Sequence, residues 1–295
     1  MNRTVKVILL IAVVLIPVGA ILTALGIHYG GKTSWSYGFG KGMKPVSNEI
    51  VSDTIDLKDF DSLKLDVASI DVNISEGDSY KLEYTVREGM EPEITEDAGK
   101  LTVKQPSTAN MGFGFDLNTV ANVYNITLPG AGSIDIDAES SSGEITISGI
   151  NVTGKIKASS GDIFISGSKG KDLSVKTSSG KISCDGVTAD SAEFTASSGE
   201  IDLSGITADD VLCDTSSGDI DIKDSQVKDV DCEASSGEVK IELDGKEDDY
   251  SYDISSSSGD IKVNGHKSEK KYEEDGGKGK IKIKTSSGDI EVSVK

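Results

Sequence analysis

The sequence has few of the residues that build catalytic sites and metal centres. Its 295 residues include two histidines, three cysteines and 5% aromatics, and 36% are hydrophobic. This content of large apolar side chains is too low for the hydrophobic core of an ordinary layered enzyme. The cysteines show no CxxC spacing and are too few for a disulfide framework, so neither a zinc site nor a disulfide-stapled fold is expected. Neither histidine recurs beside a nucleophile and no GxSxG elbow occurs, so we expect no catalytic residue, no cofactor and no enzyme activity.

Basic residues are also in deficit. The chain has 30 Lys plus Arg against 50 Asp plus Glu, a net charge of −20. This balance disfavours nucleic acid as a partner, because phosphates are bound by clustered lysine and arginine. The deficit is uneven, since residues 1–48 contain no acid and five bases, which leaves 25 bases against 50 acids in the rest. Those bases are Arg3, Lys6, Lys32, Lys41 and Lys44.

Residues 7–27, VILLIAVVLIPVGAILTALGI, form an uncharged apolar run. At about 1.5 Å per residue a helix of this length crosses a hydrocarbon core of roughly 30 Å. The run predicts a transmembrane helix that anchors the chain in the lipid bilayer. Arg3 and Lys6 make residues 1–6 the cytoplasmic side, so we expect the C-terminal domain to be extracytoplasmic.

A cleaved signal peptide is the alternative interpretation of this segment, but the run exceeds an ordinary h-region of about 7 to 15 residues. Residues 28–48 then predict a flexible juxtamembrane linker. Its aromatic residues Trp35, Tyr37 and Phe39 are suited to the headgroup level of a membrane.

A tripeptide, Ser-Ser-Gly, recurs through the second half of the chain, followed by a charged residue and then Ile or Val. Its intervals are 18, 19, 19, 19, 19, 22 and 29 residues. A period near 19 is typical of a solenoid, in which each repeat buries its apolar face against its neighbours. The glycines are Gly143, Gly161, Gly180, Gly199, Gly218, Gly237, Gly259 and Gly288.

Apolar residues stand at fixed distances from these glycines. The second and fourth residues after each glycine and the fifth before it are apolar at every repeat. Spacing by two indicates strands with alternate residues buried. Residues 131–295 therefore predict an all-β, parallel β-solenoid (a β-helix) with rungs about 4.8 Å apart and right-handed winding. Cys213 and Cys232 share one inward column on adjacent rungs; we favour core packing over a disulfide between them.

The corner at the tripeptide is expected to place glycine at positive φ, with each serine hydroxyl bonded to the equivalent serine of the next rung. The residue directly after the glycine is acidic in seven of the eight repeats, so these residues are expected to form an acidic column along one edge of the solenoid. We interpret it chiefly as a solvated edge that keeps the solenoid soluble. The alternative is Ca²⁺ binding by neighbouring carboxylates, although the calcium repeat GGxGxD is absent. The metal candidates are Asp219, Glu238, Asp260 and Asp289.

The two ends of the repeat region are less regular. Residues 49–130 contain alternating strands that we expect to form irregular first coils and cap the N-terminal end. Within them, residues 107–119 predict a loop whose Met111, Phe113 and Phe115 tuck over the cap, with an exposed apolar contact as the alternative. Residues 264–280 are a charged excursion, and the chain then ends on the strand GDIEVSVK, so we expect an open C-terminal end.

Ser-Ser-Gly-Asp-Ile stands at residues 159–163, 216–220, 257–261 and 286–290, with variants between. With the anchor, the alternating strands and the Leu-Pro-Gly turn at 128–130, residues 49–295 resemble a large bacterial family of candidate adhesins without assigned activity. Some members look like products of cell-envelope stress operons. The resemblance implies a β-helical surface module of the bacterial cell membrane and supplies no catalytic residue.

The leading functional hypothesis is a non-catalytic, membrane-anchored adhesin that contacts a cell surface or another component of the envelope. One alternative is an envelope-stress sensor or scaffold that acts through a membrane-protein partner. An alternative of another class is a polysaccharide-active β-helix enzyme, which would use carboxylates such as Asp219 and Asp260.

Overall fold

The computed structural model of the chain describes residues 49–106, 122–130 and 133–295, helical residues at 13, 15–19, 21–23, 25 and 28, and the backbone of short strands at 34–38, 42–45 and 111–114. The chain divides into two compact units. The N-terminal unit consists of Met1–Ile50, Arg87–Gly89 and Ser107–Val120, and the solenoid unit consists of Val51–Val86, Met90–Pro106 and Ala121–Lys295.

The N-terminal unit contains helical residues and a small sheet. Residues 15–19 and 21–23 are helical. Among the residues that the structure describes, no helical stretch combines the length and apolar character that crossing a bilayer needs. Much of the predicted span over 7–27 lies outside the described residues. The sheet has the strand order β2 (Gly42–Pro45), β1 (Ser34–Gly38) and β9 (Met111–Gly114), and both pairings are antiparallel.

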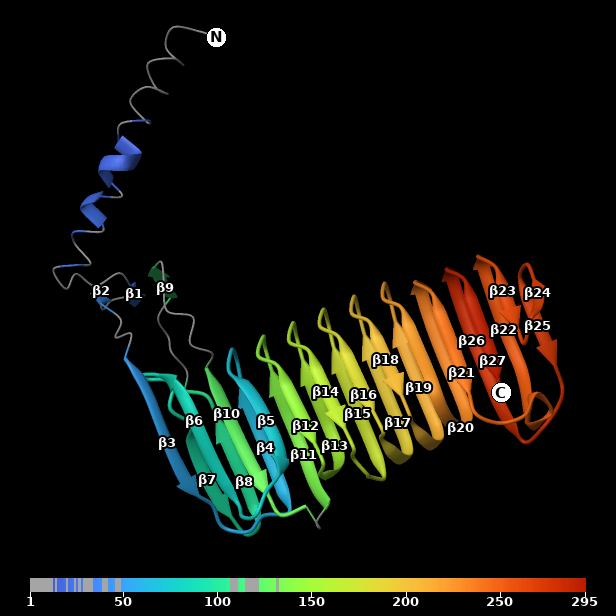
Figure 1. The fold of residues 1–295 in the computed structure, drawn as a ribbon, viewed down its shortest axis with the longest axis horizontal. Coiled ribbons are helices and arrows are strands. Elements are labelled where there is room, and N and C mark those ends of the chain that lie inside the picture. The colour runs from blue at the N-terminus through green and yellow to red at the C-terminus, as the bar shows by residue number, and fades with distance from the viewer. Residues whose placement is uncertain are drawn as a thin grey trace, which may run out of the picture. The chain divides into compact units, whose positions relative to one another are not determined.

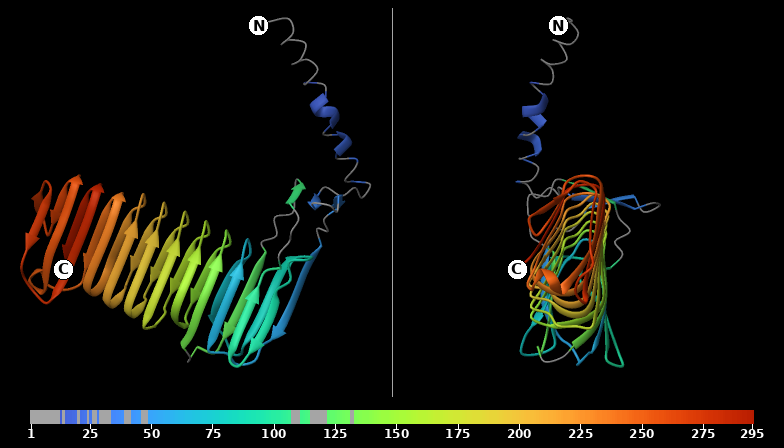
Figure 2. Two further views of the ribbon diagram at one scale, coloured as in Figure 1. Left: turned by 180° about the vertical axis from the view of Figure 1, so that it is seen from behind. Right: turned by 90° about the vertical axis from the view of Figure 1, so that its right-hand side faces the viewer.

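The solenoid unit is built from coils of two strands each, and successive coils stack side by side (Figure 1). The strands form two facing sheets, which appear as two walls in the view along the stack (Figure 2). In spatial order the short-strand sheet contains β6 (Lys81–Arg87), β10 (Val123–Leu128), β5 (Asp71–Glu76), β12 (Ile145–Ser148), β14 (Ile163–Ser166), β16 (Ile182–Asp185), β18 (Ile201–Ser204), the start of β20 (Ile220–Ser236), β21 (Val239–Leu243), β27 (Ile290–Val294), β23 (Ile261–Val263) and β24 (His266–Ser268).

The long-strand sheet faces it across the core. In the same direction it contains β7 (Glu93–Asp97), β8 (Lys100–Lys104), β4 (Ser62–Val67), β11 (Ser133–Ser140), β13 (Asn151–Ala158), β15 (Asp172–Thr177), β17 (Thr188–Ala196), β19 (Thr207–Thr215), the remainder of β20, β26 (Gly279–Ser287), β22 (Tyr250–Ser258) and β25 (Lys271–Glu274). The short 3₁₀ helix η1 (Glu247–Asp249) precedes β22. The predicted all-β architecture of stacked parallel strands is confirmed, while right-handed winding stays a prediction.

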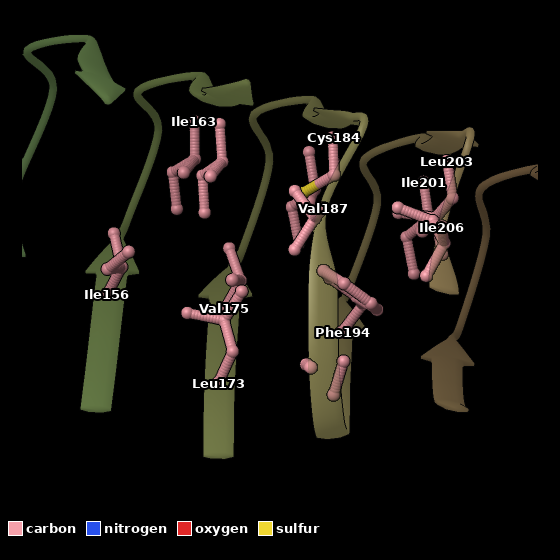
Figure 3. Packing of buried hydrophobic residues seen from close by; sticks show 14 of the residues in the cluster. Ile156, Ile163, Leu173, Val175, Cys184, Val187, Phe194, Ile201, Leu203 and Ile206 are labelled. Atoms are coloured by element: carbon pink, nitrogen blue, oxygen red, sulfur yellow. The ribbon is translucent and has the colours of Figure 1, made fainter. Parts of the chain in front are cut away.

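Stacked columns of small and branched side chains fill the core, as the sequence pattern predicts. Ile156, Val175 and Phe194 occupy successive positions of one column, because their strands pair in register. All three are fully buried, and Figure 3 shows them beneath the neighbouring column that contains Ile163 and Cys184. Each coil therefore buries apolar side chains from both sheets in a narrow interior.

The C-terminal end of the solenoid differs from the prediction. The last two strands in the sequence, β26 and β27, do not end the stack but lie between the coil of β20 and β21 and the coil of β22 and β23. The outermost coil is β22 and β23, and its edges pair with the antiparallel strands β25 and β24. The expectation of an open end is therefore wrong, because the charged excursion over 264–280 supplies the capping strands.

Charge pairing across strands explains this order. Lys282 of β26 lies directly between Asp231 of β20 and Asp253 of β22, and its Nζ is 2.8 Å from an Asp231 carboxylate oxygen. If β22 followed β20 in space as it does in sequence, the two aspartates would face each other, which is unfavourable in a sheet. The short-strand sheet repeats the alternation with a lysine, a glutamate and a lysine on successive strands: Lys240, Glu291 and Lys262.

The N-terminal end is also closed by antiparallel strands. The coil of β4 and β5 stacks in parallel on that of β11 and β12, and β8 and β10 form the next coil outward. Strands β7 and β6 then pair antiparallel to β8 and β10. Strand β3 (Ile50–Asp56) pairs with β6 beyond them. Both ends of the solenoid thus offer antiparallel edges in place of a repeat-like coil.

Candidate functional site: the outer surface at the Ser-Ser-Gly corner

The glycine of each Ser-Ser-Gly corner lies against a backbone carbonyl of the neighbouring coil, that of Ile70 for Gly143 and that of the equivalent glycine for the other corners. A Cβ built on Gly180 would lie 2.0 Å from the Gly161 carbonyl oxygen, and one on Gly199 would lie 1.7 Å from that of Gly180. No side chain fits at these distances. The expected positive φ is wrong for five of the eight glycines: Gly143, Gly161, Gly180, Gly199 and Gly218. Close approach of the stacked backbones is the reason for glycine here.

Backbone groups, not serine hydroxyls, connect the corners from coil to coil. The Ser160 N–H donates to the Ser141 carbonyl at 2.8 Å, and Ser198 does the same to Ser178 at 2.8 Å. Among the described residues we find no hydroxyl-to-hydroxyl bond between the corner serines, so the predicted serine ladder is wrong. The serines of the corner are exposed at every coil, which leaves a double row of hydroxyls facing solvent.

A buried hydroxyl three residues before the glycine takes the role expected of the serines. The Gly180 N–H donates to Thr177 Oγ1 at 3.1 Å, and Gly218 donates to Thr215 Oγ1 at 3.0 Å. Residues with and without a hydroxyl alternate in this column as far as Thr285, and the outermost residue again carries a hydroxyl. The spatial order is Ser140, Ala158, Thr177, Ala196, Thr215, Ala234, Thr285 and Ser256.

Aspartates of the acidic column bind the backbone of the neighbouring coil. The Lys181 N–H donates to the Asp162 carboxylate at 2.7 Å, Glu238 donates to Asp219 at 2.8 Å, and Asp260 donates to Asp289 at 2.8 Å. The short aspartate side chain reaches this N–H, so these residues have a structural role in the corner. Asp71 makes the same bond to Glu144 at 3.0 Å, and sequence reasoning missed it because no Ser-Ser-Gly precedes it.

Of the four metal candidates, Asp219 and Glu238 lie on neighbouring coils, and so do Asp289 and Asp260. Within the described ranges no three histidine, cysteine, aspartate or glutamate side chains gather as a metal site would need. Calcium binding here stays a prediction.

Lys181, the one base of the column, pairs with acids of the next coil on the short-strand sheet. Its Nζ lies 3.1 Å from Asp202 and 3.5 Å from Glu200. Lys223 approaches the same Asp202 from the other side at 3.2 Å, and this hydrogen bond raises the pKa of Lys223. The Lys181 ammonium group therefore reduces the electrostatic repulsion between the neighbouring carboxylates.

A groove runs along the other side of the corner, on the edge of the long-strand sheet. It has a volume of about 500 Å³ and extends from β4 across β11, β13 and β15 to β17. One corner serine of each of four coils lines one side: Ser141, Ser159, Ser178 and Ser197. The other side is the column Asp66, Glu139, Lys157, Lys176 and Thr195, which pair in register on successive strands.

Ion pairs hold the charged side chains of this groove in place. Lys157 Nζ lies 3.3 Å from Glu139, and Lys176 Nζ lies 2.6 Å from Glu193. The groove therefore presents exposed hydroxyls beside ammonium and carboxylate groups at a spacing set by the coils. Such groups can form hydrogen bonds with a polar ligand that repeats along its length.

The cysteines and histidines form no nucleophile and base pair in the described part of the chain. The three cysteines are buried with free thiols. Cys213 and Cys232 occupy adjacent coils in register, as predicted. The sulfur contact with Cys232, together with burial, raises the pKa of the Cys213 thiol, which makes it a poor nucleophile. His266 lies exposed on β24, away from the corner serines.

Comparisons with known proteins support this architecture. No curated protein matches the chain. A solved structure of a candidate adhesin from Bacteroides fragilis has a TM-score of 0.55 at 14% identity, covering 83% of this chain and 98% of that one. Another, from Parabacteroides distasonis, has a TM-score of 0.53 at 15% identity with the same coverages, 83% and 98%. At such identities the likeness shows the fold alone.

The profile of one protein family covers most of the chain. It matches residues 60–293, which include every coil of the solenoid from β4 to most of β27. The chain therefore belongs to the Toastrack DUF4097 family.

Proposed function

We propose that this protein is a non-catalytic adhesion module, anchored in the cell membrane by residues 7–27, whose solenoid binds polysaccharide outside the cell. The observation that carries the proposal is the groove beside the Ser-Ser-Gly corner. The four strands that precede its corner serines stand about 4.8 Å apart, so equivalent hydroxyls repeat over about 14 Å. A polysaccharide presents hydroxyls at regular spacing and matches such a surface better than a compact ligand does.

The exposed apolar residues of the N-terminal unit support the anchoring. Val13 and Ile16 are 69% and 70% exposed on the helical residues. Other large apolar side chains of this segment are exposed too, namely Leu15, Val18, Ile21, Leu22 and Leu25. Exposed apolar side chains in such number are typical of a lipid or protein contact.

A bulky side chain in the groove tests the binding site. We expect Ser178→Trp to lower the adhesion of cells displaying the full chain to immobilised envelope polysaccharide at least tenfold, because the indole fills the groove. Ser286→Trp is the matched control: it holds the same corner position on β26, outside the groove. Equal adhesion of the two variants would contradict the proposed site.

The same assay separates the other hypotheses. Adhesion that is lost on removal of Ca²⁺ and reduced by Asp219→Asn would assign the acidic column to calcium. Release of shorter saccharides that stops with Asp219→Asn or Asp260→Asn would identify an enzyme and overturn the non-catalytic proposal. If deletion of residues 49–295 leaves an envelope-stress response intact, the N-terminal segment acts as a scaffold through a membrane partner.

A further inference from the structure

The three-stranded sheet of the N-terminal unit separates two kinds of residue onto its two faces. Residues directly opposite each other in an antiparallel pair share a face, as do alternate residues of one strand. Trp35 stands opposite Phe113 and Pro45, and Tyr37 stands opposite Met111 and Met43. One face therefore holds only apolar and aromatic residues: Trp35, Tyr37, Met43, Pro45, Met111 and Phe113. The other holds Ser34, Ser36, Gly38, Gly42, Lys44, Gly112 and Gly114.

Strands far apart in the sequence build this face. Strands β1 and β2 come from the segment that follows the predicted span, whereas β9 comes from the connection between β8 and β10 (Figure 1). The sheet therefore joins the segment that follows the predicted span to the connection that precedes β10.

Charge identifies the occupant of that face. The whole chain carries −20, yet residues 1–48 hold five bases and no acid, and residues 107–115, STANMGFGF, hold no charge. A basic, aromatic segment directly after an apolar run suits the interface of a bilayer that contains anionic lipids. A basic segment is attracted to an acidic protein surface too, but only a bilayer also accommodates the uncharged apolar run of residues 7–27 that precedes it.

We propose that the apolar face of this sheet lies on the lipid interface of the membrane that holds residues 7–27. The proposal rests on the proposed anchoring and adds a second membrane contact, in which β9 joins the juxtamembrane strands. Tryptophan and tyrosine are enriched at the headgroup level of a membrane. Trp35 and Tyr37 both belong to β1, the central strand of the sheet.

Trp35 allows a direct test, because it is the single tryptophan of the chain. The full chain is reconstituted in vesicles of phosphatidylcholine and phosphatidylglycerol, with and without bromine on the acyl chains near the headgroup. We expect brominated lipid to quench Trp35 emission at least twofold. Phe113→Asp, on the same face, should abolish most of that quenching, whereas Ser36→Asp, on the other face, should retain it.

Vesicle flotation separates the two proposals. Failure of the wild-type chain to float with vesicles overturns the anchoring itself. Flotation with no quenching of Trp35, or with equal quenching in both variants, overturns the sheet contact alone. Trp35 emission that depends on protein concentration and not on lipid would assign the face to a second copy and would also overturn the proposal.

Discussion

Two glycine columns run along the solenoid at the scale of single residues, and they have different physical causes. At the Ser-Ser-Gly corner a carbonyl of the preceding coil occupies the place of a side chain, as it does at Gly199. At the opposite corner the glycines adopt left-handed backbone, with φ between 59° and 70°, and Asp224 adopts φ 50° in the equivalent place. That column is Gly149, Gly167, Gly186 and Gly205. Sequence reasoning missed it because its flanking residues vary.

Ser168 is a buried residue whose hydroxyl has no hydrogen-bond partner in the structure. It is 1% exposed and follows the left-handed Gly167, in a place that Ile150 and Val187 fill in the neighbouring coils. Burying an unpaired hydroxyl costs about 1 to 3 kcal/mol. We therefore expect Ser168→Val to raise the free energy of unfolding by about 1 kcal/mol, as measured by urea denaturation.

Ser225 provides the matched control with the opposite sign. It follows Asp224 as Ser168 follows Gly167, but its hydroxyl accepts from the Ile206 N–H at 3.0 Å and donates to the Lys223 carbonyl at 2.7 Å. Ser225→Val should lower the free energy of unfolding by about 1 kcal/mol. The interpretation is wrong if the two variants change stability in the same direction.

At the scale of elements, alternating hydrophobicity predicts the strands but not which strands are neighbours. Every inward column read from the Ser-Ser-Gly glycines is buried. The spacing from one glycine to the next cannot show that β26 precedes β22 in space, because equivalent coils have equivalent apolar patterns. Only the outward charges carry that information, through the lysines of β26 and the acids of β20.

The charge alternation of these strands predicts the effect of reversing one lysine. Lys282→Glu places a carboxylate between Asp231 and Asp253, and we expect it to lower the free energy of unfolding by about 1 kcal/mol. Lys284→Glu should cost less, because it faces one acid, Glu233, and the uncharged Ser255. Denaturation at low and high salt measures both, since salt screens exposed charges. The explanation is contradicted if Lys282→Glu lowers the free energy of unfolding no more than Lys284→Glu does.

At the scale of the whole molecule, the sequence predicts the parallel stack and misses its closed C-terminal end and its groove. The stack follows from a repeat that recurs in every coil. The groove depends on which residues occupy one outward column over five strands, from Asp66 to Thr195, and these share no motif. The ends depend on antiparallel strands such as β24 and β25, whose short charged sequences resemble a loop.

The last coil predicts an unusual response to truncation. Strands β22 and β23 pair with the rest of the solenoid through β26 and β27, since their other partners are the capping strands. Deletion of residues 276–295 should therefore release the coil from 246 to 275 as well, and limited proteolysis should cut within it at least tenfold faster than in the full chain. A protected 246–275 segment would show that β22 can pair with β20 despite facing acids.

The inserted position of β26 and β27 also bears on how the protein is made. The chain leaves the ribosome from its N-terminus, and a solenoid whose coils stacked in sequence order could close step by step during synthesis. Here residues 279–294 complete an interior coil, so the outermost coil cannot assume its native pairing before these residues have been translated. Folding of that coil is therefore coupled to the synthesis of β26 and β27, and a product that terminates before them lacks a closed end from the outset.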